Sequence, residues 1–222
     1  MGSLKIQRLS SISGIIGTSI ILICSLIAAL DFEENPGESY SILNHFISEL
    51  GHTQRSELHW VFNGGLIVGG AFLIVFSQGI SLGFTGLIRN LISVTAFIAA
   101  FSCSLVGFFP VDDFDSHVRV ALSFFGMGLF TIAMVTLLTL LGRTPDLPNL
   151  SVVPGIITVL AFSAFLLSPS DQFIEWINNP DDFIRPTIWH KTILEWISFF
   201  SMISWIMIVS VMQLGRIIRS EN

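Results

Sequence analysis

The sequence predicts an all-α, polytopic membrane protein with six transmembrane helices. Hydrophobic residues make up 52% of the chain and charged residues only 12%, and the charged share of an ordinary soluble domain is about 25%. The mean hydropathy is +0.77. The uncharged residues also gather into six long runs that charged segments separate. Together these features exclude an ordinary soluble enzyme, a disordered chain and a coiled coil.

Each run can supply the roughly 20 apolar residues that a helix needs to cross a bilayer. The first lies between Arg8 and Asp31, and we interpret it as a retained helix because it is longer than the apolar core of a cleaved signal peptide. The second stays uncharged until Arg89 and is too long for one span, but Gln78-Gly79 interrupts it. We expect one domain, residues 1–222, with spans at 9–30, 58–77, 90–110, 120–142, 150–168 and 196–215.

The distribution of charge predicts the orientation. Six spans place both termini on one side of the membrane, and that side has six basic and two acidic residues. The opposite side has four basic and fourteen acidic residues. Because basic segments stay cytoplasmic, we expect both termini in the cytoplasm and an acidic outer face. The acidic balance also excludes a nucleic-acid partner, which would need clustered Lys and Arg.

Two long loops, residues 31–57 and 168–195, lie on the outer side. Loops of this length are usually functional or disordered, but each contains an apolar pattern typical of a short helix. Residues 41–50 place their apolar side chains on one helical face, and Gly51 would end that helix. Residues 173–177 predict a second short helix at the interface. We therefore expect an ordered outer cap with short interfacial helices, edged by an aromatic belt of Trp60, Trp176, Trp189 and Trp196.

All five histidines fall on the same outer side as most of the acids. Histidines and a carboxylate from separate loops could bind zinc and leave one position open for water. Such a site would hydrolyse an ester or amide of a lipid headgroup. The spacing matches no dedicated metal motif, and histidines at a membrane boundary also serve as anchors or hydrogen-bond partners. The candidate metal ligands are His45, Glu49, His117 and His190.

Other polar residues near the outer boundary are candidates for catalysis or for holding the cap. A serine nucleophile is conceivable, but no G-x-S-x-G motif surrounds the serine. The predicted helices hold no ionisable residue deep in the membrane, which argues against an ion-driven pump. The catalytic candidates are Ser48, Glu49, Asp112 and His117, and the structural polar cap is Asn63, Arg119 and Glu195.

A small-residue motif lies in the second predicted span. Gly65 and Gly69 are four residues apart, a spacing that lets two helices approach closely. We interpret the motif as packing against a neighbouring span, since no strand precedes it and no lysine follows it as a nucleotide-binding loop would need. The same face could also hold together a homo- or hetero-oligomer.

Three segments resemble the bacterial and archaeal membrane family called domain of unknown function 998. They are Tyr40-Ser-Ile-Leu-Asn-His-Phe-Ile-Ser-Glu-Leu-Gly51, Phe62-Asn-Gly-Gly-Leu-Ile67, and Val106-Gly-Phe-Phe-Pro-Val-Asp112 with the nearby His117. The resemblance covers about residues 40–130 and implies a six-helix bundle in a bacterial or archaeal cell membrane. It assigns no activity. The residues that match the family's pattern are Ser48, Glu49, Asn63, Asp112 and His117.

The sequence thus predicts an integral membrane protein of unassigned activity that has an acidic, histidine-bearing pocket on its outer face. We expect this pocket to face or bind membrane lipids, and we identify no cofactor. Two alternatives remain open. One is a metal-dependent lipid hydrolase at the outer leaflet, with zinc as the candidate metal, and the other is a small subunit of a larger membrane complex. Whether the protein is an enzyme stays undecided at this point.

Overall fold

The computed structural model describes residues 2–32, 39–144, 147, 149–179 and 182–221. Six of the helices in these ranges are long and apolar enough to cross a membrane. The prediction of an all-α membrane protein with six spans is therefore confirmed. The spanning helices are α1 (Gly2–Leu30), α2 (His59–Ser81), α3 (Gly86–Phe108), α4 (Phe114–Leu140), α5 (Val152–Leu167) and α7 (His190–Glu221), and the short ones are η1 (Ile47–Gly51), η2 (Asn149–Ser151) and α6 (Asp171–Asn178).

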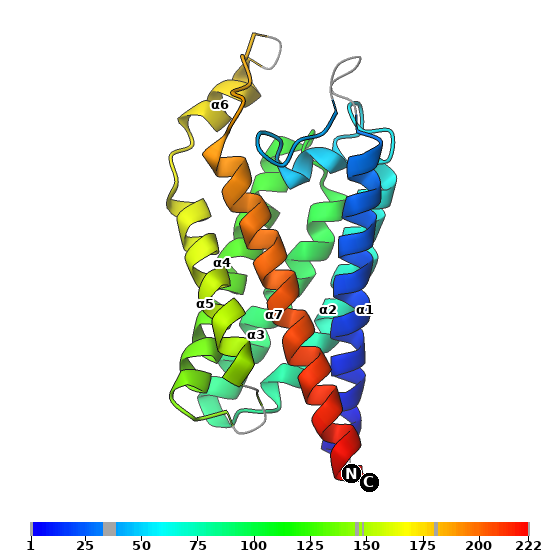
Figure 1. Cartoon of the computed structure of the whole chain (residues 1–222), viewed down its shortest axis with the longest axis vertical. Helices are drawn as coiled ribbons and strands as arrows, with labels where there is room; N and C mark the ends of the chain where they lie inside the picture. Colours follow the sequence, from blue (N-terminus) through cyan, green and yellow to red (C-terminus); the bar gives the residue numbers. More distant parts are fainter. Residues whose placement is uncertain (1, 33–38, 145–146, 148, 180–181, 222) are drawn as a thin grey trace.

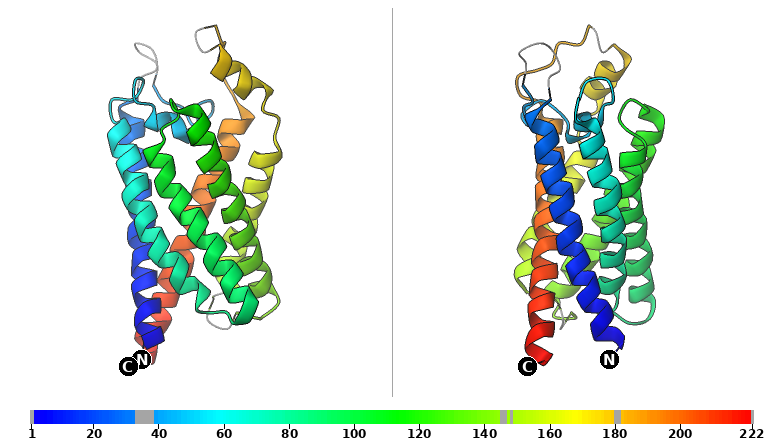
Figure 2. Two further views of the ribbon diagram at one scale, coloured as in Figure 1. Left: turned by 180° about the vertical axis from the view of Figure 1, so that it is seen from behind. Right: turned by 90° about the vertical axis from the view of Figure 1, so that its right-hand side faces the viewer.

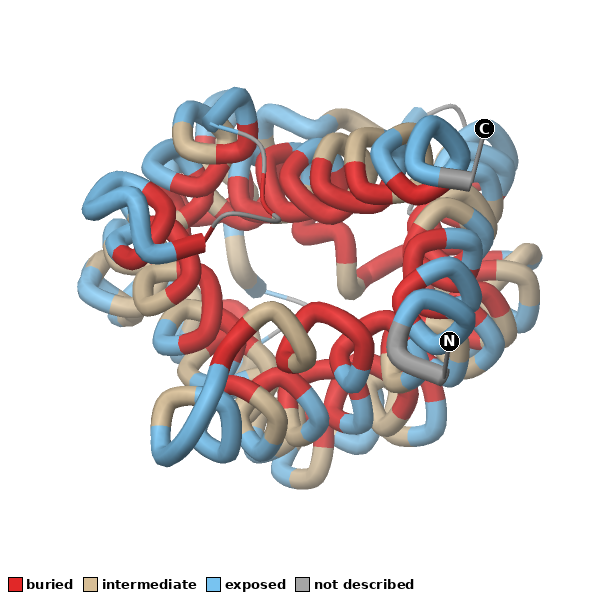
Figure 3. Tube along the Cα trace, turned by 90° about the horizontal axis from the view of Figure 1, so that it is seen from below, coloured by how far each residue is buried: buried red, intermediate tan, exposed pale blue. Residues whose placement is uncertain are grey.

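The six long helices form a closed ring. Each packs against the long helices before and after it, and α7 packs against both α5 and α1. The two termini lie at one end of the bundle, and η1 and α6 lie at the other (Figure 1, Figure 2). Buried residues face the middle of the ring (Figure 3). The outward-facing residues are also apolar, such as Leu137 and Leu160, as contact with lipid requires.

The glycine motif of α2 packs against α1. A Cβ atom on Gly65 would overlap the side chain of Cys24, and one on Gly69 would overlap Ile21 and lie 2.9 Å from the carbonyl oxygen of Gly17. The close approach that the motif predicts is thus made within the chain. The face that was also predicted to hold an oligomer together is filled by α1.

Four spanning helices, α1, α3, α4 and α7, begin earlier than the sequence predicts, and two of them do so at the capped end of the bundle. α4 begins at Phe114 and α7 begins at His190, whereas the predicted spans begin at residues 120 and 196. The prediction ended each span at the nearest ionisable residue, but a helix continues through such residues when their side chains find partners. His117 therefore lies in the first turn of α4, and Glu195 lies buried within α7. Glu195 lies in the second turn of α7, near the capped end of the bundle rather than deep in the span.

The outer cap is folded, with two corrections to the prediction. The first helix is a short 3-10 helix, η1, and Ile42 lies outside it and is exposed. Three of the tryptophans assigned to an aromatic belt, Trp176, Trp189 and Trp196, are instead buried, while Trp60 is exposed. Trp176 and Trp189 pack around Phe46 in a small core of the cap's own. Aromatic rings near the boundary thus join the cap to the bundle rather than face the lipid headgroups.

Candidate functional site

A buried ion pair joins the two long outer loops. The guanidinium of Arg185 donates from Nη2 to Glu49 Oε2 at 2.7 Å and from Nη1 to Glu49 Oε1 at 3.2 Å. It also donates to the carbonyl oxygen of Asn44 at 2.7 Å and lies 5.6 Å from the ring centre of Trp176. The Glu49 side chain is 1% exposed. A two-pronged pair of this kind fixes both partners in one geometry, so it holds the second outer loop on η1.

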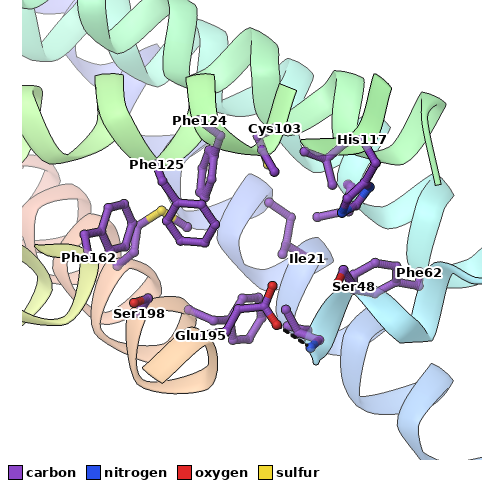
Figure 4. A pocket seen from close by; sticks show the side chains of 16 residues that line it. Ile21, Ser48, Phe62, Cys103, His117, Phe124, Phe125, Phe162, Glu195 and Ser198 are labelled. Atoms are coloured by element: carbon purple, nitrogen blue, oxygen red, sulfur yellow. Dashed lines mark hydrogen bonds between the residues drawn. The ribbon is translucent and has the colours of Figure 1, made fainter. Parts of the chain in front are cut away.

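Two buried glutamates, Glu49 and Glu195, bind the N-terminal end of η1. Glu49 accepts the backbone N–H of Phe46 at 2.7 Å, and Glu195 of α7 accepts the backbone N–H of Ile47 at 2.7 Å (Figure 4). The first N–H groups of a helix have no partner within it and favour a negative charge. Burial raises the pKa of Glu49, and the Arg185 guanidinium opposes that rise. Glu49 thus stabilises η1 from within that helix, and Glu195 anchors it to α7 of the bundle.

Asn63 anchors the other end of η1. Its side-chain amide donates from Nδ2 to the carbonyl oxygen of Gly51 at 3.0 Å. A Cβ atom on Gly51 would overlap the Asn63 side chain, and one on Gly107 of α3 would overlap the Asn63 carbonyl. Gly51 and Gly107 belong to two of the segments that carry the family resemblance. These segments meet at Asn63 because the two glycines allow close approach.

We expect Asn63→Ala to lower the free energy of unfolding by about 1–2 kcal/mol, because it leaves the buried Gly51 carbonyl without its donor. Asn90→Ala is the matched control, since Asn90 is an exposed residue of α3. Unfolding of both variants in mixed micelles, followed by circular dichroism, measures the difference. Equal stability of the two variants would contradict this role of Asn63.

His117 is buried at the start of α4. Its Nδ1 lies 2.8 Å from the carbonyl oxygen of Phe109. A carbonyl only accepts, so Nδ1 carries the proton. This contact closes the turn between α3 and α4 across Pro110.

His45 belongs to an aromatic cluster beneath the cap. Its ring lies against Phe32 and Tyr40, at centroid distances of 5.4 Å and 5.1 Å. The Tyr40 hydroxyl donates to the carbonyl oxygen of Phe46 at 2.8 Å, and the Trp196 indole donates to the carbonyl oxygen of His45 at 3.2 Å. Burial raises the pKa of Tyr40 well above its ordinary value, with Glu49 adding to the effect. Aromatic side chains thus pack around the His45 ring, which leaves it in a structural rather than a metal-binding environment.

Asp112 is exposed in the turn before α4 and binds a different partner. It accepts from the Thr53 hydroxyl at 2.7 Å and from the Thr53 backbone N–H at 3.2 Å. Partial burial acts to raise the pKa of Asp112, but the Thr53 hydrogen bonds outweigh it, so the pKa lies below its ordinary value. Asp112 therefore ties the α3–α4 turn to the first outer loop.

The candidate metal ligands do not gather in one place. Across the ranges that the structure describes, no three His, Cys, Asp or Glu residues lie together in a way that could hold a metal ion. Glu49 is engaged with Arg185, His117 with Phe109, and His190 is exposed at the start of α7. The zinc hypothesis therefore has no ligand set among the described residues.

A cavity lies beside the candidate residues, between α4, α5 and α6. It has a volume of about 290 Å³ and is lined largely by aromatic and aliphatic side chains. A second, inner cavity of about 70 Å³ lies toward the middle of the ring (Figure 4). The residues that line both cavities are Ser48, His117, Ala121, Phe125 and Glu195.

Three of the sequence candidates, Ser48, His117 and Glu195, thus share one apolar cavity at its polar end. Asn63 and Glu49 do not line this cavity but hold η1 in place beside it. Arg119 is exposed on α4.

Sequence reasoning missed two residues that matter for this site. Arg185 was not a candidate, because nothing in the sequence pairs it with Glu49. Lys191 lines the cavity, and its ammonium donates to the carbonyl oxygen of Ser168 at 3.2 Å and to the hydroxyls of Ser168 and Ser170 at 2.9 Å and 3.1 Å. A positive charge near the last carbonyl groups of a helix is favourable. Lys191 therefore caps the C-terminal end of α5. The sequence did offer one signal for Lys191, because it lies one helical turn before Glu195, a residue already among the candidates.

Comparison with known protein families places the chain in one of them. The model for the family described as Protein of unknown function (DUF998) matches residues 15–212. The chain therefore belongs to this family of membrane proteins, as the resemblance predicted, and the match extends through the later helices. No curated protein matches the chain. No solved structure matches it either.

Proposed function

We propose that this protein is a lipid-binding membrane protein that takes a single alkyl chain into the cavity between α4, α5 and α6. The observation that carries the proposal is the cavity itself, about 290 Å³ in volume, with an apolar wall and a polar end. Pockets for small molecules have volumes of about 300–1,000 Å³ and are mostly apolar with a few placed polar groups. The volume of the cavity is just below that range, which favours one chain rather than two.

The lining supports a ligand that comes from the bilayer. The wall includes Phe125, Phe165 and Phe173, which offer an apolar surface along the length of the cavity. Leu122 of α4 and Ile174 of α6 also line it and are 54% and 53% exposed. Half-exposed apolar side chains at the edge of a membrane protein face lipid. A chain could therefore enter sideways between α4 and α6 without crossing water.

The cavity lies at the end of the bundle opposite the termini. With the termini in the cytoplasm, as the basic residues near them favour, the cavity opens to the outer leaflet of the cell membrane. The acidic outer loops then border the entrance.

Neither alternative function has an observation in its favour. A zinc-dependent hydrolase needs converging ligands, and the described ranges bring no such group together. A subunit that docks through Gly65 and Gly69 would need that face free, and α1 fills it.

Filling the cavity tests the proposal. Ala121 lines both cavities, so Ala121→Phe places a ring where the chain would lie. We expect this variant to lose at least tenfold in affinity for a dodecyl-chain amphiphile, measured by native mass spectrometry of protein in phosphatidylcholine nanodiscs. Gly126→Phe is the matched control on the same helix, because a Cβ atom there meets nothing within 4 Å. Equal binding by both variants, or no binding by the unmodified protein, would overturn the proposal.

A further inference from the structure

The polar end of the lipid cavity presents mainly hydrogen-bond acceptors. These acceptors determine which lipid headgroup can bind there. Glu195 accepts the backbone N–H groups of Ile47, through Oε2, and of Ser48, and a carboxylate has about four acceptor sites. Capacity for a ligand therefore remains at Glu195. Glu195 lines both cavities, and Figure 4 shows it among the side chains of the inner one.

His117 adds an acceptor at the same end. Its Nδ1 proton is committed to the carbonyl oxygen of Phe109 at 2.8 Å. In a neutral imidazole that donates from one nitrogen, the other nitrogen is an acceptor. The ring lines both cavities, so Nε2 is the nitrogen that remains for a ligand.

Ser48 is the third polar group of this lining. Ser48 is half-buried, and its side chain lines both cavities. A hydroxyl oxygen with two lone pairs can accept from a ligand. Ser48, His117 and Glu195 come from η1, α4 and α7, so a headgroup between them would touch three elements at once.

Among the described residues that line the cavity, Lys191 is the one with a basic side chain, and its protons already have acceptors. Lys191 Nζ donates to oxygen atoms of Ser168 and Ser170, with a further contact of 3.4 Å to the carbonyl oxygen of Phe165. An ammonium has three protons, and these acceptors use them. A phosphate headgroup would therefore find none of the Lys191 N–H groups free to donate to it.

We propose that the cavity selects amphiphiles whose polar end donates hydrogen bonds, namely a long-chain amine or alcohol headgroup, over those with a phosphate headgroup. This inference rests on the proposed lipid-binding function and names the ligand class for the same cavity. The headgroup donates to Glu195, His117 and Ser48 while its single chain lies along the phenylalanine wall.

Four dodecyl probes of equal chain length test this selectivity in phosphatidylcholine nanodiscs at matched mole fraction. They are dodecylamine, 1-dodecanol, dodecyltrimethylammonium and dodecyl phosphate, and native mass spectrometry measures their occupancy. The amine and the alcohol have donors, whereas the trimethylammonium has charge without N–H groups. We expect the two donors to bind about tenfold more tightly than the other two, because a missing hydrogen bond costs about that factor. Equal binding of all four probes, or preferred binding of the phosphate, would overturn the inference.

Two variants locate the selectivity. Ser48→Ala and Glu195→Gln should each reduce the preference for dodecylamine over dodecyltrimethylammonium by about fivefold. Ser198→Ala is the control, because the Ser198 hydroxyl lines only the inner cavity and donates to the Leu194 carbonyl of its own helix at 2.7 Å. If Glu195→Gln fails to fold, Ser48→Ala decides, and an unchanged preference in that variant contradicts the inference. Failure of all four probes to bind would instead refute the lipid-binding function itself.

Discussion

Replacing Arg185 with alanine is expected to lower the free energy of unfolding by about 3–5 kcal/mol, because it leaves the Glu49 carboxylate buried without its partner. Both side chains are nearly covered, at 10% and 1% exposed. The change also removes the donor to the Asn44 carbonyl and the contact with the Trp176 ring. Chemical unfolding in mixed micelles, followed by circular dichroism, measures the loss.

The loss should depend on pH with a definite sign. Burial raises the pKa of Glu49 and Arg185 opposes it, so removing Arg185 raises that pKa further. Between the ordinary and the raised pKa the folded state binds more protons than the unfolded state, and stability falls as pH rises through this window. The Arg185→Ala variant should therefore lose more stability at pH 8 than at pH 5. A loss that is independent of pH would contradict the ion-pair explanation.

Arg119→Ala is the matched control for this prediction. Arg119 lies exposed on α4, and surface substitutions usually change stability by less than about 0.5 kcal/mol. If the two arginine variants are equally stable, the buried pair does not hold the cap. The double variant Arg185→Met with Glu49→Leu should recover much of the loss, since it buries no unpaired charge.

The second large effect is expected at the interface of α1 and α2. Gly69→Val should destabilise the protein by about 3 kcal/mol, because overpacking a tight interface forces backbone to move. Here a Cβ atom would overlap Ile21 and press on the backbone carbonyl of Gly17, 2.9 Å away. A side chain can relieve such a clash by changing rotamer, but the backbone of α1 cannot. The two helices must therefore move apart. Unfolding in mixed micelles reports the change.

Gly64→Val controls for the intrinsic effect of replacing a glycine within the same helix. A Cβ atom on Gly64 meets nothing within 4 Å, and the helix propensities of the two sites are the same. This variant should stay within about 0.5 kcal/mol of the unmodified protein. Comparable losses at Gly64 and Gly69 would show that the glycine spacing does not govern the packing of α1 on α2.

The spanning helices could be predicted because lipid imposes length and apolarity on each of them. Their ends were harder to predict. The predicted spans began after His117 and Glu195, at residues 120 and 196, yet both residues lie inside helices. Their side chains bind the backbone of Phe109 and Ile47. A partner of this kind comes from another part of the fold, so hydropathy alone cannot reveal it.

The candidate site was predictable by residue but not by pairing. Glu49, Asn63 and Glu195 were selected from their position near the outer boundary, and each has a tertiary partner in the cap. Arg185 is 136 positions from Glu49 in the chain. No local spacing connects residues so far apart, and several other basic residues were equally plausible partners. The sequence predicted an acidic, histidine-bearing pocket on the outer face but not its apolar wall, which combines aromatic residues from three helices.

The central claim is that a single alkyl chain occupies the cavity between α4, α5 and α6, and photo-crosslinking tests it most directly. A dodecylamine with a diazirine at the end of its chain would be activated in nanodiscs, and the modified residues would be mapped by peptide mass spectrometry. We expect the modification to concentrate on lining residues such as Leu122, Phe165 and Ile174 and to be lost in Ala121→Phe. Modification spread evenly over outward-facing residues such as Leu137 and Leu160, and unchanged in Ala121→Phe, would contradict the claim.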